Sequence, residues 1–292
     1  MTVEAPARTA FAVTTRSALK GYRHFPLMML ASRRIRRQLA VTPGVVRWAS
    51  IVAGPREFWT LTLWSSRDAM MAFMGSGAHE SVMWLFGRWL RAFWLTRWRP
   101  TADEVGTWEG LPIAPAPAPA PAIRRTPDQQ AALDAALDAF PRLRDSVGED
   151  GAARLETAGV TKRDRREVQG TGTVVVRVVA ARRRDAPAVW RSLAALRRAL
   201  DDRDDVLRRA VGLAGPREAF ALVLLRDEAA CADLATSAVI DQLRHRWDDG
   251  LWVMRWEAAN EFGHWDGLRL RQHRHRTDVA LPPGAGAAAG QG

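Results

Sequence analysis

Cysteine is almost absent from the chain: Cys231 is the single one among 292 residues. One thiol cannot form an intrachain disulfide, so the sequence excludes a disulfide framework and fits the reducing cytoplasm, where we expect the protein to be. The cysteine and histidine residues also lack the spacing of a zinc site. A disulfide-stapled protein and a zinc-finger protein are therefore both excluded.

Long apolar runs are missing as well. A membrane-spanning helix needs about 18 consecutive apolar residues. The best candidate, 82–98, is interrupted by Arg88, Arg91 and Arg97. The N-terminus has no apolar core of the length that a secretory signal peptide needs. The sequence therefore predicts a soluble protein.

Lysine is scarce, with only Lys20 and Lys162, yet the formal net charge is +11 because arginine is abundant. Such a charge is compatible with nucleic acid, an anionic membrane surface or acidic small molecules as partners, or with solvated basic faces alone. The first strands lack the paired aromatic residues on which RNA-binding modules stack bases, so nucleic acid is not expected. Glycine-rich nucleotide-binding motifs are absent too. Peripheral membrane contact stays among the predicted partners.

The most informative feature that is present is an internal repeat. The tetrapeptide Gly-Pro-Arg-Glu at 54–57 recurs at 215–218, which is 161 residues later. The register continues on both sides and, after one deletion, aligns the Gly-x-Trp-acid-Gly segment at 106–110 with that at 263–267. Colinearity over so long a stretch indicates a duplicated unit.

Hydrophobic periodicity and turn residues predict the same order of elements in both copies. Pro26 suits the first turn of a helix, and Ser66 or Asp68 suits a helix N-cap. In the first copy we expect strands at 11–16, 45–52, 57–64 and 92–99 and helices at 26–39, 69–74 and 79–90. In the second we expect strands at 173–179, 205–213, 218–225 and 250–257 and helices at 187–200, 227–235 and 238–246.

The order strand-helix-strand-strand-helix-strand is that of the ferredoxin-like fold. One such sheet leaves a face that must be covered, and a second copy in the same chain can cover it. We therefore predict an α+β protein in which two ferredoxin-like βαββαβ repeats form an intrachain pseudo-dimeric α/β barrel, with further oligomerisation left open. The predicted parts are the first repeat at 11–111, an Ala/Pro-rich linker with a short helix at 112–170, the second, degenerate repeat at 171–268, and a disordered tail, basic and then Gly/Ala-rich, at 269–292.

Three short motifs resemble a known family. They are Val46-Arg47-Trp48 on the second predicted strand, the run Thr60-Leu-Thr-Leu-Trp64 ahead of a capped helix, and the two Gly-x-Trp-acid-Gly segments. The unit resembles the dimeric α/β-barrel monooxygenase-like proteins, and more narrowly the spheroidene monooxygenase family of carotenoid biosynthesis. The resemblance implies an oxidoreductase, haem-dependent in one reading, that acts on a long apolar polyene.

The two copies differ in their aromatic and imidazole residues. At the constant offset, Trp48, Trp64 and His79 correspond to Arg209, Leu225 and Ile240. Because a duplicated enzyme needs only one working pocket, we place the site in residues 20–98. There we predict a lining for a hydrophobic, polyene or polyketide-like substrate, formed by Met28, Trp48, Trp59, Trp64 and Trp84.

Other tryptophans occur in both copies, and we interpret them as packing. Trp94 and Trp98 recur as Trp252 and Trp256. The tryptophans of the two Gly-x-Trp-acid-Gly segments, Trp108 and Trp265, are expected to plug the ends of the barrel.

His79 is the predicted metal ligand and catalytic residue. It follows Gly75-Ser-Gly77 at the start of a predicted helix, where partly positive N–H groups lower the pKa of an imidazole and favour its neutral, metal-binding form. A neutral imidazole among apolar residues suits the proximal side of haem; a solvent-exposed histidine is the alternative.

His24 is a second catalytic candidate, and with Arg23 it would hold a substrate or a haem propionate, unless both lie on a surface loop. Arg47 is an alternative partner for an anionic group.

Two readings need no haem. In a cofactor-independent oxygenase of the antibiotic-biosynthesis type, the aromatic lining would desolvate the substrate and His79 would act as its base. In a non-catalytic binding protein, the same pocket would carry an apolar ligand to a partner. The sequence leaves these readings open.

Overall fold

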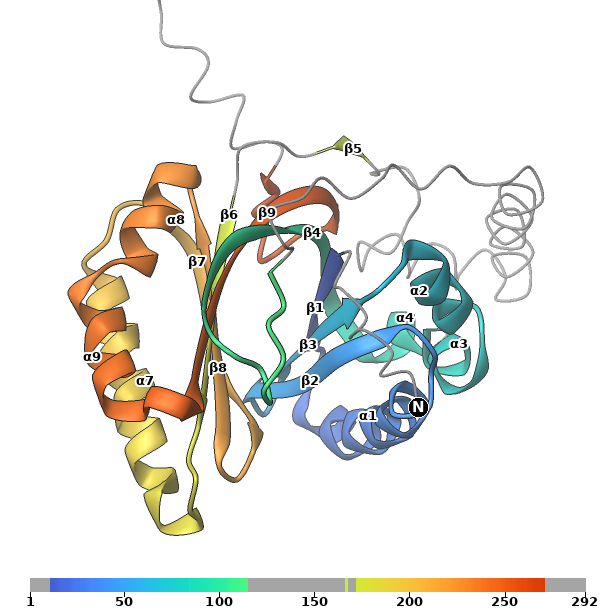
Figure 1. The fold of residues 1–292 in the computed structure, drawn as a ribbon. Coiled ribbons are helices and arrows are strands. Elements are labelled where there is room, and N and C mark those ends of the chain that lie inside the picture. Colours follow the sequence, from blue (N-terminus) through green and yellow to red (C-terminus); the bar gives the residue numbers. More distant parts are fainter. Residues whose placement is uncertain (1–10, 84, 115–165, 168–171, 271–292) are drawn as a thin grey trace, which may run out of the picture.

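The computed structural model describes residues 11–83, 85–114, 166–167 and 172–270 (Figure 1). Most of the predicted linker at 112–170, its short helix and nearly all of the predicted tail lie outside these residues. Trp84, predicted to bind substrate, lies outside them as well.

The first part of the chain alternates strands and helices in the predicted order. Pro26 occupies the first turn of its helix, where the missing N–H costs no hydrogen bond. The Ser66 hydroxyl caps the next helix, since it accepts a hydrogen bond from the backbone N–H of Ala69 at 3.1 Å. The elements are β1 (Phe11–Leu19), the 3-10 helix η1 (Tyr22–His24), α1 (Phe25–Leu39), β2 (Val45–Gly54), β3 (Glu57–Trp64), α2 (Arg67–Met74), α3 (Gly77–Met83), α4 (Phe86–Trp89) and β4 (Leu90–Gly106).

The second part repeats this order after one short strand. Asp227 caps α8 as Ser66 caps α2: its carboxylate accepts a hydrogen bond from the backbone N–H of Ala230 at 2.8 Å. The elements are β5 (Arg166–Glu167), β6 (Gly172–Val179), η3 (Arg183–Asp185), α7 (Ala186–Asp201), β7 (Val206–Gly215), β8 (Glu218–Leu225), α8 (Glu228–Ala235), α9 (Ala238–Trp247), η4 (Asp248–Gly250) and β9 (Leu251–Gly263).

Several elements differ from the sequence-based expectation: the short strand β5 was not predicted, and β9 extends to Gly263, beyond the predicted end at 257. The helix predicted at 79–90 is divided, because the N–H of Leu85 bonds to the carbonyl of Val82, three residues back, and so interrupts the α-helical pattern before α4 begins. Strand β4 extends well beyond residue 99 because it pairs on one side with β1 and on the other with β9.

The strands form a closed barrel. In the order β4-β1-β3-β2-β7-β8-β6-β9 every neighbouring pair is antiparallel, and pairing between β4 and β9 closes the ring. The other junction between the two parts is narrower, with Val52 of β2 opposite Leu213 of β7. At that junction a Cβ on Gly212 would lie 2.6 Å from the carbonyl oxygen of Val52, so only glycine allows the strands to approach this closely.

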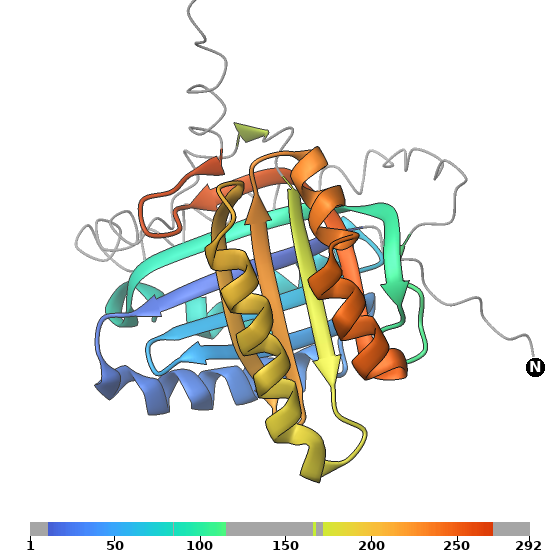
Figure 2. The ribbon, with the colours of Figure 1, turned by 90° about the vertical axis from the view of Figure 1, so that its left-hand side faces the viewer.

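The helices cover the outside of the barrel in two separate layers. Helices α1 to α4 lie on one side and α7 to α9 on the opposite side (Figure 1). Figure 2 shows α7 and α9 lying side by side along the strands of the second part. The structure is thus α+β, with an eight-stranded antiparallel barrel between two helical layers.

Tryptophan side chains fill the interior of the barrel. Successive residues of a strand point to opposite faces, so Trp59 of β3 points inward while Phe58 packs under the helices. The predicted packing role of the recurrent tryptophans is confirmed, because all four are buried in the central cluster with Trp59, Trp108 and Trp265; they are Trp94, Trp98, Trp252 and Trp256.

The two Gly-x-Trp-acid-Gly turns are exchanged between the two parts of the chain. Trp265, near the end of the second part, packs against Trp59 and Trp94 of the first, with ring centroids 4.4 and 5.4 Å apart. Trp108 of the first part packs against Phe220 and Trp252 of the second. The chain segments therefore interlock inside the barrel.

Buried arginines reinforce this exchange. Arg16, which is 2% exposed, donates hydrogen bonds to Glu57 and to Asp266, each at 2.7 Å. Asp266 follows Trp265, so this bond ties the second turn to β1. Arg177 makes the corresponding bond to Glu218 at 2.6 Å and lies 3.7 Å from Glu109 of the first turn. A buried charge needs such partners, because an unpaired one would be costly to desolvate.

Replacement of Trp265 by alanine tests the interlock. We expect Trp265→Ala to lower the free energy of unfolding by about 3 to 5 kcal/mol, because a large buried aromatic side chain leaves a cavity. Trp190→Ala is the matched control: this side chain on α7 is 47% exposed, and the change should be within about 0.5 kcal/mol. Urea denaturation measures both; equal losses in the two variants would contradict the interlock.

Candidate functional site

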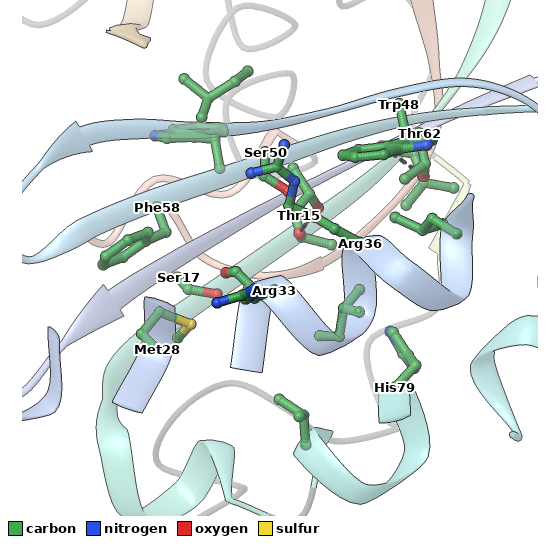
Figure 3. Close-up of a pocket in the computed structure, with 18 of the residues that line it drawn as sticks. Thr15, Ser17, Met28, Arg33, Arg36, Trp48, Ser50, Phe58, Thr62 and His79 are labelled. Atoms are coloured by element: carbon green, nitrogen blue, oxygen red, sulfur yellow. Dashed lines mark hydrogen bonds between the residues drawn. The ribbon is translucent and has the colours of Figure 1, made fainter. Parts of the chain in front are cut away.

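A cavity of about 970 Å³ lies between the outer face of strands β1 to β4 and helices α1 to α3. Figure 3 shows labelled side chains that line it, from the strands, from α1 and from α3. Its lining is mostly apolar and includes Met28, Trp48, Phe58 and Met70. The cavity is outside the barrel, in the layer where the second part has a continuous core.

One helix position that faces the sheet carries a smaller side chain in the first part than in the second. Leu193 of α7 is fully buried against the second sheet, whereas the residue 161 positions earlier, Ser32 of α1, lines the cavity. The strands differ mainly in polarity rather than in side-chain size. Five cavity-facing hydroxyl residues, which we call the hydroxyl row, have aliphatic counterparts in the second part: Thr15, Ser17, Ser50, Thr60 and Thr62 correspond to Val176, Val178, Val211, Ala221 and Val223.

The hydroxyl row is only partly satisfied by the protein. Thr15 and Thr60 hydrogen-bond to each other, and Thr62 accepts a hydrogen bond from the indole N–H of Trp64 at 2.8 Å. Within the described ranges, the hydroxyls of Ser17 and Ser50 bond to no other residue. Because a buried hydroxyl without a partner is costly, these two serines can bind water or polar atoms of a ligand.

The rim of the cavity is basic. Arg33, Arg36 and Arg37 of α1 line it and are exposed. The guanidinium of Arg36 lies over the ring of Trp48, 5.3 Å from its centroid, which restrains this side chain at the rim. None of the three forms a salt bridge with a carboxylate in the part of the chain that the structure describes. They are therefore available to an anionic group of a ligand.

His79 of α3 borders the cavity from the helical side. Its Nδ1 lies 3.2 Å from the carbonyl oxygen of Met74, which only accepts, so Nδ1 carries the proton and Nε2 presents a lone pair. No other described residue bonds to Nε2. The ring of Phe73 packs against the imidazole at 4.8 Å. This tautomer is the one in which Nε2 can bind a metal.

Burial lowers the pKa of His79 from 6.5 to about 4, and the bond to Met74 opposes this shift only in part. The expected direction is confirmed, but the cause differs: desolvation dominates, whereas the sequence indicated the helix N-terminus. The side chain is half-buried, because part of the imidazole surface faces the cavity while protein atoms enclose the rest. The imidazole is neutral at pH 7.

The predicted site residues fall into two groups. Met28, Trp48, Trp64 and His79 line the cavity. Trp59 borders it, but its side chain packs inside the barrel.

The remaining predicted residues lie elsewhere. Arg23 and His24 form part of η1, away from the cavity lining, and Arg23 Nε donates to His24 Nε2 at 3.3 Å. Arg47 is engaged at the end of the barrel with the Trp108 carbonyl and Glu109. These residues do not join His79.

Two parts of the site were missed by sequence reasoning: the hydroxyl row and the arginines of α1 at the rim. A signal for the first existed, because each of its residues aligns with an aliphatic residue of the second copy. Among the arginines only Arg33 gave a comparable signal, since it aligns with Ala194, whereas Arg36 and Arg37 recur as Arg197 and Arg198.

Other chemistries find less support. The single thiol is inert, because burial raises the pKa of Cys231 to about 12. Among the described residues, no group of three or more His, Cys, Asp or Glu could hold a metal ion. In the same residues, no helix is both long enough and apolar enough to cross a membrane.

Comparison with known proteins gives only distant likenesses. No protein-family model and no curated protein matches the chain. Among solved structures, an aldoxime dehydratase has a TM-score of 0.48 at 9% identity and is matched over 89% of this chain and 85% of its own. A proposed monooxygenase of Fusobacterium nucleatum has a TM-score of 0.33 at 6% identity, over 87% and 93%. A heme-binding protein of Thermus thermophilus has a TM-score of 0.24 at 11% identity, over 94% and 100%.

These likenesses identify neither a family nor a chemistry, because every TM-score lies below 0.5. None of the three is described as a spheroidene monooxygenase, so that resemblance stays a prediction.

The pKa of His79 predicts a specific loss of stability in mild acid. Between pH 6.5 and 4 the unfolded chain binds a proton at His79 that the folded chain does not, so the free energy of unfolding falls as the pH falls through this window. At pH 5 this protonation lowers the free energy of unfolding by about 2 kcal/mol. His79→Ile, which copies Ile240, should remove it; His245→Gln on the exposed face of α9 should not. Urea denaturation at pH 7 and at pH 5 measures this loss. If His79→Ile loses as much stability between the two pH values as the wild type does, the prediction is refuted.

Proposed function

We propose that this protein is a monooxygenase-like oxidoreductase that binds a hydrophobic small molecule in the cavity and holds haem through His79. The observation that carries the proposal is the neutral imidazole of His79, whose Nδ1 is held by the Met74 carbonyl and which lines a cavity of about 970 Å³ with a largely apolar lining. A cavity of this volume lies at the upper end of the range for small-molecule sites, about 300 to 1,000 Å³.

The residues present fit haem in three respects. Protein-bound haem iron is commonly ligated by one histidine, and the Nδ1–H of His79 is already directed at a backbone carbonyl, as in many metal-binding histidines. Arg33 and Arg36 at the rim could pair with the two propionates. Phe58 and Trp48 supply apolar surface for the macrocycle. When bound, haem would supply the activation of dioxygen.

The chain itself would position and shield the substrate. Met28, Phe73 and Val82 are buried in the cavity lining and would exclude water around a bound substrate, which would strengthen any electrostatic interaction made there. Ser17 and Ser50 would accept or donate hydrogen bonds to oxygen atoms of the substrate. The hydroxyl row thus favours an oxygen-bearing, polyketide-like molecule over a bare polyene hydrocarbon.

A cofactor-independent oxygenase is less well supported by the same imidazole. A general base works best when its pKa lies near the operating pH, and a pKa of about 4 makes His79 a weak base at pH 7. Transport of an apolar ligand without catalysis requires the cavity alone. The hemin titration below distinguishes this carrier function from a haem-dependent enzyme.

We also propose that the two parts of the chain arose by duplication of a ferredoxin-like unit. The strand order β4-β1-β3-β2 in the first part and β9-β6-β8-β7 in the second supports this origin. Loss of the cavity in one copy and its retention in the other would then explain the difference between the helical layers.

Hemin titration tests the haem proposal. Purified protein is expected to bind added hemin with a Soret band shifted from that of free hemin, and His79→Ala should abolish the shift because it removes the side chain that would hold the iron. His24→Ala is the matched control, since His24 lies outside the cavity lining, and it should bind like the wild type.

The alternative results are decisive in different ways. A shift lost in His24→Ala rather than in His79→Ala would move the site to η1. No shift in any form, together with binding of an apolar probe, would leave the carrier function.

Selectivity for oxygen-bearing ligands tests the hydroxyl row. Ser17→Ala together with Ser50→Ala should weaken binding of 1-hydroxypyrene about fivefold, as expected for the loss of one hydrogen bond. Binding of pyrene should be unchanged. Ser81→Ala, whose hydroxyl bonds to the carbonyl of Gly77 within α3, is the control. Pyrene fluorescence measures all of these affinities, and equal weakening for both probes would count against a polar role for the serines.

A further inference from the structure

Exposed large apolar side chains are concentrated around α1. Of those found in the described residues, five lie between positions 22 and 41: Tyr22, Leu27, Met29, Leu30 and Val41, with exposed fractions from 39 to 79%. The sixth, Trp190, is on α7. Scattered exposed apolar residues are ordinary, but a contiguous group marks an interaction surface.

The same helix carries an outward row of arginines. Leu27, Leu30, Arg34 and Arg37 are spaced three or four residues apart, so they share one face of α1. All four are exposed, whereas the opposite face is buried through Met28 and Leu39. We call these four residues the α1 stripe: its N-terminal half is apolar and its C-terminal half is basic.

The stretch of chain that contains the α1 stripe has charge of one sign. Residues 11–56 contain no aspartate or glutamate, and their charged side chains are Arg16, Lys20, Arg23, Arg33, Arg34, Arg36, Arg37, Arg47 and Arg56. In the described part of the chain, no carboxylate forms a salt bridge with Arg34 or Arg37. A partner that supplies both negative charge and apolar contact would therefore match the stripe.

We propose that the α1 stripe docks the protein on a membrane surface that contains anionic lipid. Lipid headgroups supply the negative charge for Arg34 and Arg37, and the acyl boundary accepts Leu27 and Leu30. A second copy of this chain is a poorer partner, because residues 11–56 contain no carboxylate, so a two-fold contact through α1 would bring like charges together without supplying negative charge. Nucleic acid would pair with the arginines but offers nothing to the exposed leucines.

The second part of the chain provides an internal comparison. Helix α7 occupies the equivalent place on the other side of the barrel, and Arg197 and Arg198 align with Arg36 and Arg37. Its exposed apolar side chain is Trp190, and acidic residues flank it, with Asp185 before the helix and Asp201 at its end. The combination of apolar and purely basic surface thus distinguishes α1 from α7.

Docking would also place the cavity rim at the membrane. Leu30 of the stripe borders the cavity, as do Arg33 and Arg37. An apolar ligand could then pass between the bilayer and the cavity without crossing bulk water. The docking itself does not depend on haem or on catalysis. Hemin binding therefore tests the proposed function, vesicle binding tests the docking, and either result can be negative while the other is positive.

Vesicle co-sedimentation of the full chain tests the proposal. We expect binding to vesicles of phosphatidylcholine with 30% phosphatidylglycerol, about tenfold weaker binding to pure phosphatidylcholine, and release at high salt, which screens exposed charges. Leu27→Ser with Leu30→Ser, and separately Arg34→Gln with Arg37→Gln, should each weaken binding to the anionic vesicles about tenfold.

Matched substitutions on α7 control for charge and folding. Arg197→Gln with Arg198→Gln removes the same charge, and Trp190→Ser removes an exposed apolar side chain; both should bind like the wild type. Every form keeps the same basic residues outside the described ranges, so these contribute equally. Equal weakening by the α7 variants would overturn the proposal, as would unchanged binding of the leucine variant. Sedimentation velocity that shows a dimer, dissociated by the leucine substitutions, would assign the stripe to a second copy instead.

Discussion

Closure of the eight-stranded barrel is the constraint on which the rest of the structure depends. A barrel of this size has an interior just wide enough for its own side chains, and here tryptophans fill it. The exchanged residues Trp108 and Trp265 complete that filling from the opposite parts of the chain. Because the interior is solid, a large ligand can be accommodated only between the sheet and a helical layer, which is where the cavity lies.

The two helical layers show how one backbone plan yields a core or a cavity. In the second part, Leu193 and Val176 belong to a closed core; in the first, the smaller Ser32 and the polar Thr15 at the equivalent positions line the cavity. An open layer forfeits the dispersion contacts and apolar burial that a filled layer gains. The barrel and the second layer can carry this loss of stability, because their burial and the interlocked turns are independent of the cavity.

Helix α1 connects the site to the surface. Its inner face lines the cavity through Met28, its rim carries Arg33 and Arg36, and its outer face bears the α1 stripe. Opposite, Gln38 of α1 accepts a hydrogen bond from the backbone N–H of His79 at 3.0 Å. A change in the position of α1 would therefore displace His79 as well as the rim, so a contact at the protein surface could alter the position of the imidazole.

The sequence by itself determined the order of the elements, the packing role of Trp94, Trp98 and their counterparts, and the part of the chain in which a cavity would form. These follow from local periodicity and from comparison of the two copies, and both signals can be read directly from the amino-acid sequence. The sequence could not decide that Trp59 points into the barrel while Trp48 faces the cavity, since alternation defines two faces without telling which one is enclosed. The exchange of Trp108 and Trp265, the separation of Arg23 and His24 from His79, and the burial that lowers the His79 pKa were decided only by the tertiary structure. Each of these depends on which distant segments meet when the barrel closes, and that is a property of the whole chain in space.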